Sequence, residues 1–115
     1  MEIIKNIEPK TPPMSWNEFL LYTLPCSISI NGFVNDSVKW EAGGKRLNLD
    51  HHTNCDRLTT RSTASQAAML IRSGLMESYK NEKHVYLYMN DCDEDVILTN
   101  WIFENYDIVG RIENP

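Results

Sequence analysis

The spacing of apolar residues changes along the chain, and each spacing predicts a different element. Residues 26–34 alternate isoleucine with serine, which is the two-residue period of a β-strand. The stretch 38–49 carries apolar residues on both sides of a turn at Gly43-Gly44, which predicts a β-hairpin. The short apolar run 85–89 predicts a further strand.

Two other stretches have the 3.6-residue period of a helix with one apolar face. Residues 63–79 place five side chains on such a face: Ala64, Ala68, Ile71, Leu75 and Tyr79. Thr63 and Gln66 have the spacing of a capping box. Gly74 either weakens this helix by about 1 kcal/mol or ends it. A second helix is predicted over 93–106, with a buried side formed by Ile97, Leu98, Trp101, Ile102 and Tyr106.

The beginning of the chain has a different character, because three prolines favour extended or turn backbone there. We expect residues 1–15 to form an extended arm that packs on the domain or on a neighbouring subunit. Residues 16–24 predict a short helix. Ser15 and Glu18 can form a capping box at its start, and Pro25 stops it.

The order strand, helix, strand, helix implies a right-handed βαβ crossover between parallel strands. We therefore expect one small α/β domain over residues 16–115, with a mixed sheet, one βαβ unit and two main helices. An α+β arrangement is the alternative. Ligands of such sheets bind beyond the carboxyl ends of the strands. Polar clusters follow two of the predicted strands, at residues 50–52 and 90–95.

Composition and charge narrow the classes of partner. The chain has 115 residues and a net charge of −5, so its 11 Lys and Arg cannot form the broad basic face that a nucleic-acid polymer requires. Every apolar run is too short to span a membrane. The three cysteines lack CxxC spacing, which favours reduced thiols in a cytoplasmic protein over a structural zinc site.

The cluster Asp50-His51-His52 offers a carboxylate and two imidazoles, which can bind a divalent metal or a phosphate. Adjacent side chains on an extended segment point to opposite sides, so only one histidine would share a site with Asp50 unless the chain turns there. The alternative is that a histidine makes a core or loop contact, and that Asp50 orients the following loop.

In the second cluster, Asn90 and Asp91 lie nearest the predicted strand tip and are the better site candidates. Together with a histidine, such carboxylates suit Mn²⁺ or Mg²⁺. Residues 93–95 are all acidic and coincide with a helix start, where carboxylates satisfy free N–H groups. We expect that capping role for them.

Arg57 and Arg61 lie between the first cluster and the helix that follows it. Guanidinium groups bind phosphate oxygens in a bidentate manner, and the N–H groups of the helix start would add donors to the same anion. The alternative is a pair of surface arginines that bridge to nearby carboxylates. Tyr88 could stack on a base, although most such residues belong to the core or sheet surface. Arg111 could reach the site or a neighbouring subunit.

Two motifs together resemble a group of bacterial proteins with a DHH-type phosphoesterase signature. They run from Leu49 to Thr63 and from Asn90 to Val96. The resemblance implies a manganese-dependent hydrolase of small nucleotides, with metal ligands at Asp50, His51, His52 and Asp91. However, these enzymes place an aspartate-rich motif ahead of the DHH, and here Asp36 is the only aspartate among the first 49 residues. A two-metal site needs more carboxylates than this.

The size of the chain, the Asp56-Arg57 loop and the Asn90-Asp91 strand tip resemble the phage-encoded Thoeris anti-defence 1 sponges. That family implies a bacterial host cytoplasm, a homo-oligomer (dimer or hexamer) with sites near subunit interfaces, and cyclic ADP-ribose isomers or cyclic oligonucleotides as ligands.

Taken together, the residues and resemblances predict a non-enzymatic protein that sequesters a cyclic nucleotide signal and needs no cofactor. The ligand-binding candidates are Arg57, Arg61, Asp50, His51, Asn90, Asp91, Tyr88 and Arg111. One alternative is a DHH-like Mn²⁺-dependent phosphoesterase, or a fragment of one. Another is a domain that acts through protein–protein interaction and whose motifs are structural.

Overall fold

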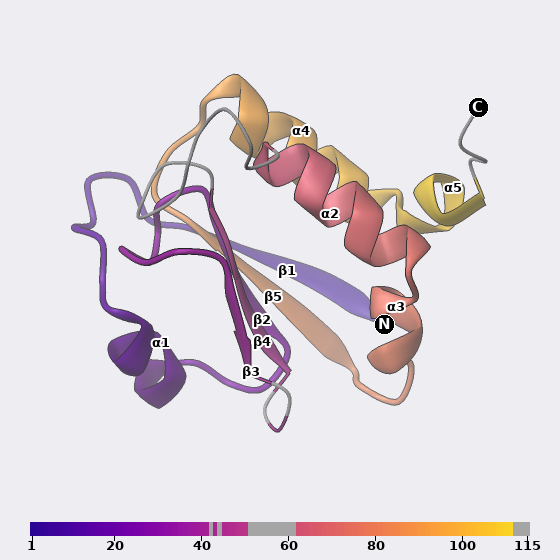
Figure 1. Cartoon of the computed structure of the whole chain (residues 1–115), viewed down its shortest axis with the longest axis horizontal. Coiled ribbons are helices and arrows are strands. Elements are labelled where there is room, and N and C mark those ends of the chain that lie inside the picture. The colour runs from indigo at the N-terminus through magenta and orange to yellow at the C-terminus, as the bar shows by residue number, and fades with distance from the viewer. Residues whose placement is uncertain (42, 44, 51–61, 112–115) are drawn as a thin grey trace.

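The computed structural model describes residues 1–41, 43, 45–50 and 62–111, which form a five-stranded mixed sheet flanked by helices (Figure 1). The strand order is β1-β5-β2-β4-β3. All neighbouring strands are parallel except β3, which pairs antiparallel to β4. The strands are β1 (Glu2–Ile7), β2 (Ser27–Ile30), β3 (Lys39–Glu41), β4 (Arg46–Leu49) and β5 (His84–Met89). The expected small α/β domain with a mixed sheet is confirmed.

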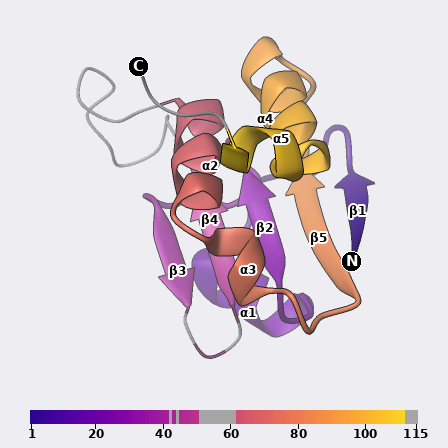
Figure 2. The same cartoon turned by 90° about the vertical axis from the view of Figure 1, so that its right-hand side faces the viewer.

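The helices lie on both faces of the sheet (Figure 2). One face carries α1 (Trp16–Tyr22), and the other carries α2 (Thr63–Arg72), α3 (Leu75–Ser78), α4 (Glu94–Glu104) and α5 (Tyr106–Arg111). The connection from β1 to β2 passes β5 by way of α1. The connection from β4 to β5 passes β2 in the opposite direction by way of α2 and α3. The direction of the crossovers therefore changes at the neighbouring strands β2 and β5.

Alternating side chains of the strands form the main core beneath α2 and α4. They are Ile28, Ile30, Leu47, Leu49, Val85, Leu87 and Met89, all almost fully buried. Burial of each such side chain contributes about 1.5–3 kcal/mol. A smaller cluster of Phe19, Phe33 and Val34 packs on the face that carries α1. The serines between the isoleucines of β2 point to this second face, as the alternating pattern predicts.

The predicted arm at 1–15 begins as a strand of the sheet rather than as a separate segment. Residues 2–7 are β1, which among the described strands lies at the edge of the sheet and pairs with β5. Further along, Asn90 holds the segment by donating from Nδ2 to the Thr11 carbonyl at 3.0 Å. None of the helices in the described part of the chain is long and apolar enough to cross a membrane.

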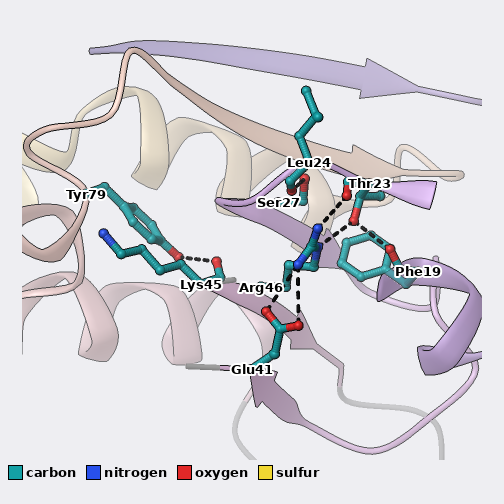
Figure 3. A network of polar contacts seen from close by, with 8 residues as sticks. All are labelled: Phe19, Thr23, Leu24, Ser27, Glu41, Lys45, Arg46 and Tyr79. Carbon is teal, nitrogen blue, oxygen red and sulfur yellow. Dashed lines mark hydrogen bonds and ion pairs between the residues drawn. The ribbon is translucent and has the colours of Figure 1, made fainter. Parts of the chain in front are cut away.

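Helix α1 starts as predicted, because Ser15 and Glu18 form the capping box. Ser15 Oγ accepts from the Glu18 N–H at 3.1 Å, and Glu18 Oε1 accepts from the Ser15 N–H at 3.3 Å. At the other end, Arg46 fastens α1 to the hairpin (Figure 3). Its Nη2 donates to the carbonyl of Thr23 at 2.6 Å, and its Nη1 donates to Glu41 at 3.2 Å.

The predicted helix over 63–79 is divided at Gly74, whose φ of 100° is the left-handed value that glycine adopts freely. The prediction that Thr63 and Gln66 form its capping box is wrong. Ser62 caps the helix by accepting from the Ser65 N–H at 3.2 Å. Gln66 Nε2 donates instead to the carbonyl of Asp50 at 2.7 Å.

The predicted buried side of the last long helix is largely wrong. Ile97, Leu98 and Trp101 are 60%, 51% and 49% exposed, although Ile102 is buried as expected. The buried residues of α4 are Val96, Thr99, Ile102 and Phe103. Apolar side chains lie on almost every side of α4, so their spacing alone does not select a face. The buried face of α4 is selected by the hydrogen bonds that Asp93 and Asp95, at the start of the helix, make with Asn31 and with α2.

Candidate functional site

The carboxyl edge of the sheet carries two buried polar residues directly after β2 and β4. Asn31 is 6% exposed and Asp50 is fully buried. Asn31 has a left-handed φ of 53°, which asparagine tolerates better than most residues, and its N–H donates to the Leu49 carbonyl at 2.8 Å. The ends of these two neighbouring strands are therefore joined through Asn31.

The side-chain amide of Asn31 also connects the sheet to the starts of two helices. Its Nδ2 donates to Asp93 Oδ2 at 3.0 Å, and its Oδ1 accepts from Thr63 Oγ1 at 3.3 Å. Asp93 is the N-cap of α4 and accepts from the Val96 N–H at 2.9 Å. Figure 1 shows the first turns of α2 and α4 at this end of the sheet. A single amide thus fixes both helix starts above β2.

Asp95 occupies the start of α2, although it belongs to α4. Its Oδ2 accepts from the Thr63 N–H at 3.0 Å, and its Oδ1 accepts from the Ala64 N–H at 2.9 Å. The next N–H, of Ser65, is bound by the Ser62 cap. The expectation that this helix start offers N–H donors to a ligand anion is therefore wrong, because a carboxylate of the protein already binds them.

The capping role expected for the acidic residues at 93–95 is confirmed for Asp93, and Asp95 caps a different helix from its own. Sequence reasoning missed Asn31 and Thr63 as members of this network. The available signal was the Asn31-Gly32 pair directly after an alternating strand, which is typical of a left-handed turn.

Of the other predicted site residues, Asn90 and Asp91 follow β5 at the same edge. Asn90 binds the backbone of Thr11, and Asp91 is exposed, with Oδ1 accepting from the Cys92 N–H at 2.6 Å. His51, His52, Asp56, Arg57 and Arg61 lie outside the described residues. The segment 51–61 that carries them connects Asp50 with Ser62.

Tyr88 and Arg111 lie away from this network. The ring of Tyr88 packs against Phe19 and Phe33, with ring centroids 5.7 and 5.4 Å away, on the face that carries α1. Burial raises the pKa of the Tyr88 hydroxyl. Arg111 is exposed at the end of α5, and its neighbour Gly110 lines a surface hollow with Met1. Because β1 begins beside Met1, Arg111 is near the amino edge of the sheet.

The described network positions residues rather than offering free groups to a ligand. Asn31, Thr63, Asp93 and Asp95 each bind another part of the protein. Within the described ranges, no group of three His, Cys, Asp or Glu side chains lies close enough to hold a metal ion. Hydrogen bonds therefore hold Asp50 and Thr63, the described residues on either side of segment 51–61, at the carboxyl edge.

Comparison of the chain with protein-family models, with curated proteins and with solved structures gave no match.

Proposed function

We propose that the protein binds and sequesters a cyclic nucleotide signal at the carboxyl edge of its sheet, without cleaving it. The observation that carries the proposal is the hydrogen bonding of the described residues that flank segment 51–61. The Asp50 carbonyl accepts a hydrogen bond from Gln66, and the Thr63 N–H donates to Asp95, so the described residues on either side of the segment are held beside β2. Ligands of α/β sheets bind at this edge, where the crossover direction changes.

The chemistry of segment 51–61 supports a phosphate-bearing ligand. Arg57 and Arg61 supply guanidinium groups for bidentate contacts with phosphate oxygens, and His51 supplies a further donor. The resemblance to the anti-defence sponges makes a cyclic ADP-ribose isomer the first ligand to test, with cyclic oligonucleotides next. In that role the protein acts in the cytoplasm of a bacterial host as a phage anti-defence protein.

The carboxylates of Asp93 and Asp95 are already hydrogen-bonded within the protein, which supports binding rather than hydrolysis. Both oxygens of Asp93 and both of Asp95 accept hydrogen bonds from protein groups. A two-metal phosphoesterase uses such oxygens to bridge and bind its metal ions. The second candidate function, a DHH-like Mn²⁺-dependent phosphoesterase or a fragment of one, rests on the strand-end position of Asp50, directly before His51 and His52.

Binding is tested with Arg57→Ala and calorimetry against cyclic ADP-ribose isomers. Loss of a desolvated, charge-assisted phosphate contact should weaken binding by about 2–4 kcal/mol. Arg72→Ala is the matched control, because it removes the same charge from the opposite, exposed end of α2. Equal affinity of the Arg57→Ala variant and the unaltered protein would remove Arg57 from the site.

Catalysis is tested by incubating the protein with Mn²⁺ and a panel of cyclic and linear nucleotides, followed by heat release and chromatography. We expect every nucleotide to return intact, at no more than the stoichiometry of binding. Product in excess of the protein, abolished in Asp50→Asn, would instead establish the phosphoesterase.

A further inference from the structure

The first strand leaves one side of its backbone open. β1 pairs with β5 on one side. There the N–H groups of Glu2 and Glu8 donate to the carbonyls of Lys83 and Met89, each at 2.9 Å. Backbone groups alternate in direction along a strand, so Ile3, Lys5 and Ile7 direct their N–H and C=O groups to the other side. At that side the described residues supply no further strand.

Several features that protect edge strands are absent from β1. It is six residues long, with no proline among them. A lysine is another such protection, and β1 has one, Lys5, which is 42% exposed and whose Nζ binds Glu104 Oε1 of α4 at 2.6 Å. The other edge strand, β3, has three residues, and short length is itself a protection. β1 is therefore the edge that is suited to pair with another strand.

We propose that β1 pairs antiparallel with β1 of a second copy, around a two-fold axis that passes beside Ile4, so that one sheet runs through both copies. A two-fold axis perpendicular to the sheet keeps each side chain on its own face. Only residues that share a face, such as Met1, Ile3, Lys5 and Ile7, can then lie opposite one another.

The register around Ile4 is self-complementary. It places Ile4 opposite the partner's Ile4, and Ile3 opposite the partner's Lys5. It also places Met1 opposite the partner's Ile7, so that two apolar side chains that are 43% and 47% exposed in one copy cover each other. Of the two neighbouring registers, the one around Lys5 would place two lysines directly opposite, which is destabilising, and the one around Ile3 would place Met1 opposite Lys5 instead of Ile7. Because the symmetry repeats the contact between Met1 and Ile7 once on each side of the axis, the register favours a second copy over an unrelated strand.

The decisive variant is Lys5→Pro. Proline removes the outward N–H of residue 5 and is tolerated in edge strands, whereas the N–H groups that bind β5 belong to its neighbours. Lys5→Ala is the matched control, because it removes the same side chain and ion pair but keeps the N–H. By light scattering, the unaltered protein and Lys5→Ala should have twice the mass of the 13.3 kDa chain, and Lys5→Pro should have the mass of one chain.

A cross-link tests the register independently of how Lys5→Pro folds. Residues on the axis form a pair without mutual hydrogen bonds, with Cα atoms about 4.5 Å apart, which is within disulfide range. Ile4→Cys should therefore give a covalent dimer on mild oxidation. Asn6→Cys and the unaltered protein should not, because residues 6 of the two copies would lie about 14 Å apart. A monomeric unaltered protein, or equal cross-linking of Ile4→Cys and Asn6→Cys, would overturn the proposal.

Discussion

At the scale of single residues, the side-chain amide of Asn31 connects the end of one strand to the starts of two helices. It combines a left-handed backbone at the end of β2 with side-chain bonds to Thr63 and Asp93. Few side chains can replace it, because the position needs a donor toward a carboxylate, an acceptor toward a hydroxyl and tolerance of positive φ.

Asn31→Asp keeps the shape of the side chain but replaces the donor with an acceptor 3.0 Å from the Asp93 carboxylate. We expect a loss of about 1–3 kcal/mol in the free energy of unfolding at neutral pH, since a buried hydrogen bond becomes a repulsion. Protonation of the introduced carboxyl at acidic pH should restore part of the loss. Urea denaturation at two pH values measures both effects, and Asn81→Asp at an exposed turn is the control. Equal stability of the Asn31→Asp variant and the unaltered protein would show that the amide bond is dispensable.

Tyr79 gives a prediction in the alkaline range. It is 1% exposed, its hydroxyl donates to the Lys45 carbonyl at 3.1 Å, and burial raises its pKa (Figure 3). The unfolded chain loses this proton near pH 10, whereas the folded chain keeps it, so the contribution to stability is complete below pH 10 and decreases above it. Tyr79→Phe should cost about 0.5–1.5 kcal/mol at neutral pH and should lose less stability than the unaltered protein between pH 9 and 11. Parallel pH profiles of the two proteins would contradict this assignment.

At the scale of elements, the predictions were correct where a sequence pattern is compatible with only one local structure. The capping box of Ser15 and Glu18 and the alternation in β2 each allow one arrangement, and both are confirmed. The buried face of α4 was mispredicted because the exposed residues Ile97 and Trp101 have the same helical spacing as the buried residues. Long-range bonds from Asp93 to Asn31 and from Asp95 to α2 decide that face, and helical spacing contains no information about them.

The break between α2 and α3 permits a matched pair of glycine substitutions. Gly74 has a φ of 100° and no atom near the position of an added Cβ, whereas Gly110 lies in α5 with ordinary contact at 3.9 Å. Gly74→Ala should destabilise the protein by about 1–2 kcal/mol through backbone strain alone. Gly110→Ala should stabilise it by about 0.5–1 kcal/mol, because alanine favours helix. Thermal unfolding of both variants checks the signs, and a stabilising Gly74→Ala would mean that the helix runs through this position.

At the scale of the whole molecule, the sequence predicted the class of fold and the edge at which polar residues gather. It did not predict that β5 lies between β1 and β2, because strand order depends on packing among distant segments. Within the candidate site, the prediction for Asp93 was confirmed, but the supposed anion-binding helix start is bound by Asp95. That arrangement needs α2 and α4 side by side, which no local pattern encodes.

The strand order also has a consequence for how the protein is made. β5 fills the position between β1 and β2, yet it follows the other four described strands along the chain. Until residues 84–89 emerge, β1 lacks its described neighbour and β2 lacks one of its two, so the nascent sheet stays incomplete up to that point. Contacts between such distant segments form late and slowly. The chain should therefore acquire its fold in one late, cooperative step, and a product that ends before His84 should stay unfolded.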